Sequence, residues 1–234
     1  MTVRALLFDK DGTLFDFHAT WSGFTRRMIE AEAGGDPDLA QGLAGALGYD
    51  LETGDFAEDS IVVAGTTEEA AARMLPLLPG ERQEALVQRM NDRAAQAPQV
   101  EAAPLRTLLG ALRARGLALG VATNDAEAPA RAHLRAAGVV DLFDFIAGAD
   151  SGHGAKPAAG QLLAFAEAVG MRPQDCAMIG DSLHDMAAAR ACGMRAVAVL
   201  SGPAGHPVLA PAADVVLPDI AALPDWLSDG APFS

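Results

Sequence analysis

Lysine is almost absent from this sequence, and cysteine is scarce. Of the 17 basic residues in 234, only Lys10 and Lys156 are lysines, so arginine supplies the positive charge nearly everywhere else. The two lysines are therefore candidates for a specific role. The two cysteines, Cys176 and Cys192, have neither the spacing of a metal site nor that of a redox motif, which favours a reduced, cytoplasmic protein.

Long apolar runs are missing as well, and this excludes a class of protein. No run approaches the roughly 20 residues of a membrane-spanning helix. The first residues lack the cleavage site of a signal peptide, so we again expect a cytoplasmic location. The net charge of −14 repels nucleic acids and anionic membranes, and we expect neither as a partner. The sequence gives no indication of the oligomeric state.

Short apolar runs alternate with helical patterns along most of the chain. The first run is almost wholly apolar and stops at Asp9, which is typical of a buried strand in a parallel sheet. The alternation predicts an α/β fold with a doubly wound parallel sheet and right-handed crossovers. Expected strands cover residues 3–8, 117–122, 145–147, 176–179, 196–200 and 215–217, and expected helices cover 105–115, 126–137, 158–169 and 183–191.

Residues 15–97 differ from the rest because strand-like runs nearly vanish there. Apolar residues recur at helical spacing, and Thr66 with Glu69 has the pattern of a capping box at a helix start. The sequence therefore predicts an all-helical domain, residues 15–97. It is inserted into an α/β core that is made of residues 1–14 and 98–234.

Polar segments follow the expected strands, at the edge of a parallel sheet where ligands bind. They are DKDGT at 9–13, TND at 123–125, KP at 156–157 and GDSLHD at 180–185. Together they bring carboxylates, hydroxyls and an ammonium group to one edge. These are the groups that a phosphoryl transfer needs, namely a nucleophile, a proton donor and positive charge around the phosphoryl oxygens.

The first segment has the two aspartates that such chemistry requires. Asp9 and Asp11 are two residues apart in extended chain, so both face the same side, and one attacks phosphorus while the other transfers protons. Gly12 allows a sharp turn beside the phosphate. Several carboxylates in one place need a hard cation such as Mg²⁺, and Asp181 and Asp185 share one face where their loop becomes helix.

Two further groups favour phosphate binding. Lys156 supplies a fixed positive charge, and Thr123 supplies a hydroxyl donor near a helix start. Thr123 and Asn124 are also typical of a helix cap, which is compatible with phosphate binding.

The motifs DKDGTL, ATN, KP and GDSLHD, in this order on an alternating α/β chain, resemble the haloacid dehalogenase-like hydrolase superfamily. The chain is most similar to phosphoglycolate-phosphatase-like members with a helical cap after the first strand. The resemblance covers four separate loops within residues 3–217. It implies a Mg²⁺-dependent hydrolase of a small phosphorylated metabolite, with 2-phosphoglycolate as the first candidate.

The same resemblance implies a role for each site residue. Asp9 is the implied nucleophile and Asp11 the implied general acid and base. The implied magnesium ligands are the Asp9 carboxylate, the Asp11 carbonyl and Asp181, while Asp185 supports the metal or orients Lys156. Thr123, Asn124 and Lys156 are the implied phosphate-binding residues, and the helical insert is the implied mobile cap.

Some side chains near the site have less specific interpretations. Lys10 occupies a position that is usually apolar in the family. Alternation directs its side chain away from the site, so we expect it to pair with an acid for structural reasons. Arg26 and Arg27 are adjacent on an expected helix of the insert, so at most one faces the site. A solvated or salt-bridged position is the favoured interpretation for both.

Two other functions remain open at this stage. A phosphomutase similar to β-phosphoglucomutase shares all of these motifs and differs in the acceptor of the phosphoryl group. A receiver-like signalling module also phosphorylates an aspartate beside magnesium, threonine and lysine. The long insert after the first strand and the DxDGT turn argue against the receiver.

Overall fold

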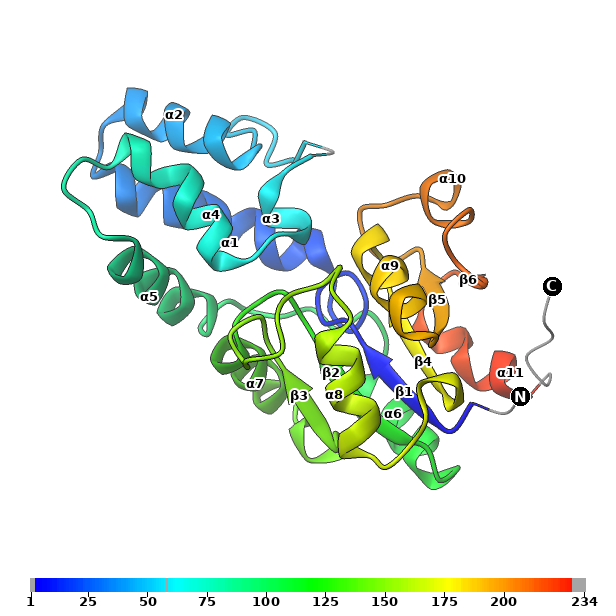
Figure 1. Cartoon of the computed structure of the whole chain (residues 1–234). Coiled ribbons are helices and arrows are strands. Elements are labelled where there is room, and N and C mark those ends of the chain that lie inside the picture. The colour runs from blue at the N-terminus through cyan, green and yellow to red at the C-terminus, as the bar shows by residue number, and fades with distance from the viewer. Residues whose placement is uncertain (1–2, 58, 229–234) are drawn as a thin grey trace.

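The computed structural model describes residues 3–57 and 59–228, and its α/β part is built on a six-stranded parallel sheet (Figure 1). The spatial order is β3-β2-β1-β4-β5-β6, so the first strand lies in the middle. The strands are β1 Ala5–Phe8, β2 Ala118–Ala122, β3 Phe145–Ala147, β4 Cys176–Gly180, β5 Arg195–Val199 and β6 Val215–Leu217. The predicted strands and the predicted fold class are confirmed.

Side chains of β1 alternate between two apolar layers, one on each face of the sheet. Leu6 and Phe8 pack into a cluster with Leu109 of one helical layer, while Leu7 packs with Phe165 of the other. All five side chains are fully buried. Because both faces are covered, the strand is apolar throughout rather than alternating with polar residues.

The core helices lie on these two faces, and most of them follow the predicted bounds closely. They are α6 Leu105–Ala114, α7 Glu127–Ala136, α8 Gly160–Ala168, α9 Leu183–Cys192, α10 His206–Leu209 and α11 Leu223–Ser228, with 3-10 turns at Val140–Leu142, Pro173–Asp175 and Ile220–Ala222. The helices α10 and α11 were not predicted. Trp226 of α11 is buried in the same cluster as Leu6.

The insert is helical, as predicted, and it has an apolar core of its own. Its helices are α1 Phe17–Ala33, α2 Pro37–Leu47, α3 Ile61–Ala64, α4 Thr67–Met74 and α5 Gln83–Ala94, with a 3-10 turn at Leu75–Leu77. The capping box of Thr66 and Glu69 is confirmed at the start of α4. Buried side chains of α1, α2, α4 and α5 form one cluster that is separate from the two clusters around the sheet.

Two connections join the insert to the α/β part, and they run side by side. The backbone N–H of Asp16 donates to the carbonyl of Val100, and the N–H of Ala102 donates to the carbonyl of Leu14. In Figure 1 the insert lies beyond the carboxyl ends of the strands. Among the helices of the described residues, none combines the length and apolar character that crossing a membrane requires.

Candidate active site

The site lies where β1 ends, between its two neighbours in the sheet. Phe8 is in register with Val121 of β2 and with Ile179 of β4, so the loops after these three strands begin at the same level. The N–H of Asp9 still donates to the carbonyl of Ile179, at 2.8 Å, which fixes the start of the first loop. The predicted convergence of the loops is therefore a direct result of strand order and register.

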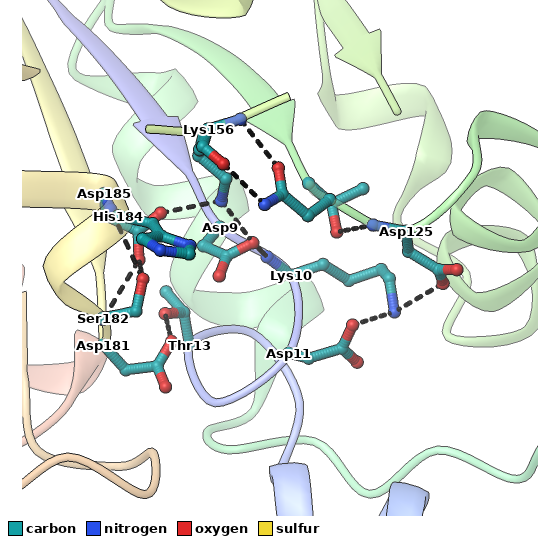
Figure 2. Close-up of polar contacts among 12 residues, drawn as sticks. Asp9, Lys10, Asp11, Thr13, Asp125, Lys156, Asp181, Ser182, His184 and Asp185 are labelled. Atoms are coloured by element: carbon teal, nitrogen blue, oxygen red, sulfur yellow. Dashed lines mark hydrogen bonds and ion pairs between the residues drawn. The ribbon is translucent and has the colours of Figure 1, made fainter. Parts of the chain in front are cut away.

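Lys156 and Asp9 form an ion pair at this edge (Figure 2). Lys156 Nζ lies 2.8 Å from Asp9 Oδ1 and 2.7 Å from Asp185 Oδ1. Both Lys156 and Asp185 are buried, and Asp9 is largely buried. Burial raises the pKa of Asp9 to about 7, although the ammonium of Lys156 opposes this rise. Asp185 also accepts a hydrogen bond from Ser182 Oγ, at 2.6 Å, which orients its carboxylate.

Asp181 adds a third carboxylate, and the three together fit a divalent metal ion. Oxygen atoms of Asp9, Asp181 and Asp185 lie within 4.8 Å of one another. Burial and the charges of Asp9 and Asp185 raise the pKa of Asp181 well above its usual value. When all three carboxyl groups are ionised, one ammonium leaves two negative charges in excess, and the raised pKa values of Asp9 and Asp181 reflect the cost of this excess. Hard oxygen donors with this excess charge are what Mg²⁺ and similar cations bind.

Two glycines allow the chain to close around Asp181. A side chain at Gly12 or Gly202 would overlap the Asp181 carboxylate, and Gly12 also has a φ of 75°, which favours glycine. Thr13 Oγ1 donates to Asp181 Oδ1 at 3.3 Å. The loop after β5 therefore contributes to the site through Gly202. The sequence analysis missed this residue because nothing in its neighbourhood resembles a motif.

Asn124 connects three parts of the chain through its side-chain amide. Its Nδ2 donates to the carbonyls of Lys156 and Ala64, both at 2.8 Å, and its Oδ1 accepts from the N–H of Lys156, also at 2.8 Å. The amide thus braces the loop that carries Lys156 against the insert. Thr123 follows β2 at the same edge of the sheet, and its Oγ1 accepts from the N–H of Asp125 at 3.1 Å.

The second lysine is also buried at the site, beside Asp11. Lys10 Nζ lies 2.5 Å from Asp11 Oδ2, 3.4 Å from Asp125 Oδ2 and 3.2 Å from His133 Nδ1. The expected pairing with an acid is confirmed, but the expectation that Lys10 points away from the site residues is wrong, since its partner is Asp11. The strand ends at Phe8 and the chain bends at Lys10, so the extended alternation on which that expectation depended stops before Asp11.

Asp125 and His133 complete this group, and neither was predicted as a site residue. His133 Nε2 lies 2.7 Å from the carbonyl of Ala94, so Nε2 carries the proton and Nδ1 accepts from Lys10. Burial and the Lys10 ammonium lower the pKa of His133 to about 4. Burial raises the pKa of Asp125 to about 6, with Lys10 opposing the rise. The other buried residues on this face of α7 are apolar, which is why the sequence did not indicate His133 as a site residue.

A cavity lies between Asp9 and the insert, beside the direct contacts that His133 makes with Ala94 and Asn124 makes with Ala64. It is lined on the sheet side by Asp9, Asp11, Thr123 and Lys156 and on the other side by helices α1, α3 and α4. Figure 2 shows that Asp9 lies between Lys156 and Lys10, with Asp11 directed toward Lys10. A ligand bound at Asp9 therefore contacts both the α/β part and the helical insert.

The fold and this edge of the sheet define an α/β protein with a helical insert after β1 and a cluster of carboxylates with two lysines at the carboxyl ends of its parallel strands. A model of the haloacid dehalogenase-like hydrolase family matches residues 3–193, and the chain belongs to that family. Within the family it is a phosphatase, as its similarity to named relatives indicates.

Several relatives carry the name phosphoglycolate phosphatase, and two of them illustrate the similarity. The protein from Chromobacterium violaceum is 33% identical over 228 residues, which cover 97% of this chain and 98% of the relative. The protein from Rhodospirillum rubrum is 41% identical over 120 residues, and this match spans about half of each chain, 51% and 50%.

Solved structures support the same fold. A predicted phosphoglycolate phosphatase from Haemophilus somnus has a TM-score of 0.73 at 18% identity, covering 96% of this chain and 98% of its own. A putative β-phosphoglucomutase from Thermotoga maritima has a TM-score of 0.68 at 19% identity, covering 97% and 99%. At these identities the likeness concerns the fold alone.

Proposed function

We propose that this chain hydrolyses a small phosphomonoester through a phosphorylated intermediate on Asp9. The observation that carries the proposal is the buried ion pair of Asp9 with Lys156, at the end of the central strand and at the base of the cavity. A carboxylate in this position is a competent nucleophile for phosphorus, and the adjacent ammonium offsets the charge of the phosphoryl oxygens.

Each remaining residue has a task in this reaction. Asp9 Oδ attacks phosphorus while Asp11 protonates the oxygen of the leaving group, and Asp11 then removes a proton from the water that hydrolyses the acyl phosphate. Within the described residues, Asp11 Oδ1 has no hydrogen-bond partner, so one oxygen is free for this proton transfer while Lys10 holds the other. Thr123 and Lys156 bind the phosphoryl group, and Asn124 positions Lys156 through its backbone.

Asp9 and Asp181 would hold Mg²⁺, together with the backbone carbonyl of Asp11, and Asp185 supports this group and orients Lys156. When bound, the ion neutralises the phosphoryl oxygens. Any side chain at Gly12 or Gly202 would overlap the Asp181 carboxylate, and this supports the assignment of Asp181 as a metal ligand whose position the two glycines make possible.

The chain divides into a catalytic core, residues 1–14 and 98–234, and a cap, residues 15–97. The separate apolar cluster of the insert and the paired connections support this division. Movement of the cap about these connections admits substrate and then excludes water from Asp9. With a net charge of −14, the chain acts on a small metabolite in the cytoplasm rather than on nucleic acid.

The first ester to test is 2-phosphoglycolate, because two relatives carry the name of its phosphatase. The experiment measures phosphate release from a panel of phosphomonoesters, with Mg²⁺ and with a chelator, for the wild type and for Asp9→Asn. We expect Mg²⁺-dependent release that Asp9→Asn abolishes while the circular dichroism spectrum is unchanged. Turnover retained in Asp9→Asn contradicts the mechanism. Labelling of Asp9 by acetyl phosphate without hydrolysis of any ester favours a mutase or a phospho-switch.

A further inference from the structure

The wall of the cavity that faces Asp9 is apolar and almost without charge. The helical insert contributes apolar side chains from α1, α3 and α4, among them Phe24, Met28 and Val63. In a phosphatase of this design, the phosphate binds at Asp9 and the leaving group extends toward this wall. The wall therefore determines which leaving groups the site accepts.

Positive charge is the most informative absence on this wall. Among the described residues that line the cavity, Lys156 is the one lysine or arginine, and Asp9 and Asp185 already pair with it. The arginines of α1 do not line the cavity. Arg26 donates to the carbonyl of Leu51, and Arg27 is exposed.

Negative charge, in contrast, is already present. Asp9, Asp11 and Asp125 all line the cavity. Lys10 lies behind the latter two and pairs with both. Lys10 Nζ also lies 5.3 Å from the centroid of the Trp21 ring, but Asp11 and Asp125 already neutralise it. A carboxylate on the leaving group would therefore be buried among apolar side chains without an unpaired cation, and an unpaired buried charge is strongly unfavourable. His184 also lines the cavity, but its Nδ1 lies 3.2 Å from the carbonyl of Ala64, so this nitrogen already has a partner.

Two uncharged polar groups stand out on the same wall. Trp21 Nε1 and Thr25 Oγ1 have no hydrogen-bond partner within the described part of the chain, and both side chains are buried and line the cavity. Buried donors are nearly always paired in folded proteins. A leaving group with a hydroxyl or a carbonyl oxygen would pair with them and remain neutral.

We propose that the preferred substrate has an uncharged leaving group with hydrogen-bonding oxygen, and that Thr25 and Trp21 of α1 recognise it. This inference rests on the proposed phosphatase function and narrows its substrate class. It ranks esters with carboxylate-bearing leaving groups, including 2-phosphoglycolate, below neutral esters of the same size.

An isosteric pair of esters tests the charge preference directly. We expect kcat/KM with Mg²⁺ to be at least about tenfold higher for 2-phosphoglycolamide than for 2-phosphoglycolate, because only the acid buries an unpaired charge. A higher value for 2-phosphoglycolate overturns this inference and leaves the phosphatase function intact. If neither ester is hydrolysed and acetyl phosphate does not label Asp9, the phosphatase function fails, and the inference fails with it.

A matched pair of variants tests the role of Thr25. Thr25→Val keeps the shape of the side chain, and we expect it to lower kcat/KM about tenfold for 2-hydroxyethyl phosphate while leaving ethyl phosphate unchanged. Thr20→Val is the control, because Thr20 is buried on the same helix but does not line the cavity. Thr20→Val should leave the ratio of the kcat/KM values for the two esters unchanged. If Thr25→Val lowers kcat/KM equally for both esters, the hydroxyl serves folding alone, and the assignment of Thr25 to leaving-group recognition is overturned.

Discussion

The two lysines of the chain occupy two buried groups on either side of Asp9, and the difference between these groups is one of charge. The Lys156 group combines one ammonium with the carboxyl groups of Asp9, Asp181 and Asp185, which leave two negative charges in excess when all three are ionised. The Lys10 group combines one ammonium with Asp11, Asp125 and a neutral imidazole. Burial and ion pairing are common to both, so neither property by itself identifies the reacting centre.

Uncompensated charge is the better guide to where chemistry takes place. A fold does not keep close buried carboxylates in excess unless a ligand offsets their repulsion, and the Lys156 group has this property more strongly. The Lys10 group has the character of a support, because its members contact one another and hold one oxygen of Asp11. The predictions that follow separate a reacting group from a supporting one.

The largest expected effect is on catalysis, in Lys156→Met. This change removes the cation that lies 2.8 Å from Asp9, so we expect kcat/KM to fall about 10³-fold, as for the loss of one transition-state donor. Phosphate release under Mg²⁺ measures it, and circular dichroism confirms that the variant is folded. A loss of less than tenfold in a folded variant would place Lys156 among the supporting residues.

Lys10→Met should affect stability more than catalysis. Without Lys10, Asp11 and Asp125 are left buried without a cation, and we expect the free energy of unfolding to fall by about 3 kcal/mol. Urea denaturation at pH 7 measures the change, and kcat/KM should fall only about tenfold, because Asp11 remains in place. Arg106→Met is the control, since its pair with Asp141 is exposed and contributes at most about 1 kcal/mol. If Lys10→Met equals this control, the Lys10 group is not a support.

Metal binding should distinguish the two groups again, with a smaller effect. At a Mg²⁺ concentration 100 times the Kd, the ion stabilises the folded protein by about 2.7 kcal/mol, which thermal denaturation detects as a higher Tm. We expect Asp181→Asn to lose this increase and Lys10→Met to keep it. A Tm that is insensitive to Mg²⁺ in the wild type would remove the metal from the proposal.

The difference between the two groups also explains what the sequence could predict. Asp9 and Asp181 directly follow apolar strands, Asp185 lies in the first turn of the helix after β4, and Lys156 lies in the loop after β3. All of these strands end at the same sheet edge, so local pattern and strand order were enough to bring the four residues together. Their closeness depends on parallel pairing, which a short apolar run indicates on its own.

The Lys10 group depends instead on tertiary contacts that local pattern does not specify. His133 reaches Lys10 only through the packing of α7 against β3 and α5, and it is one residue among several on the buried face of α7. The direction of Lys10 was predicted wrongly because the strand ends at Phe8 and the chain bends at Lys10. Gly202 approaches Asp181 from a loop after β5, over a distance in sequence at which spacing carries no information.

The smallest expected effect is the pH dependence of the Lys10 group, and His133 is the residue that reveals it. Its pKa is about 4 in the folded protein and 6.5 in the unfolded chain, because burial disfavours the charged imidazole and protonation would also place a second positive charge against Lys10. The neutral imidazole therefore stabilises the fold fully above pH 6.5, and this contribution is lost as the pH falls toward 4.

Asp9 and Asp125, whose pKa values are raised, titrate with the opposite sign, so the wild type alone does not isolate the effect of His133. His133→Gln does, since its amide can still donate to the carbonyl of Ala94 and accept from Lys10. We expect the difference in free energy of unfolding between wild type and His133→Gln to shrink by about 1.2 kcal/mol from pH 6 to pH 5. Urea denaturation at both pH values measures this, and a difference that is independent of pH would mean that burial and Lys10 do not hold the imidazole neutral.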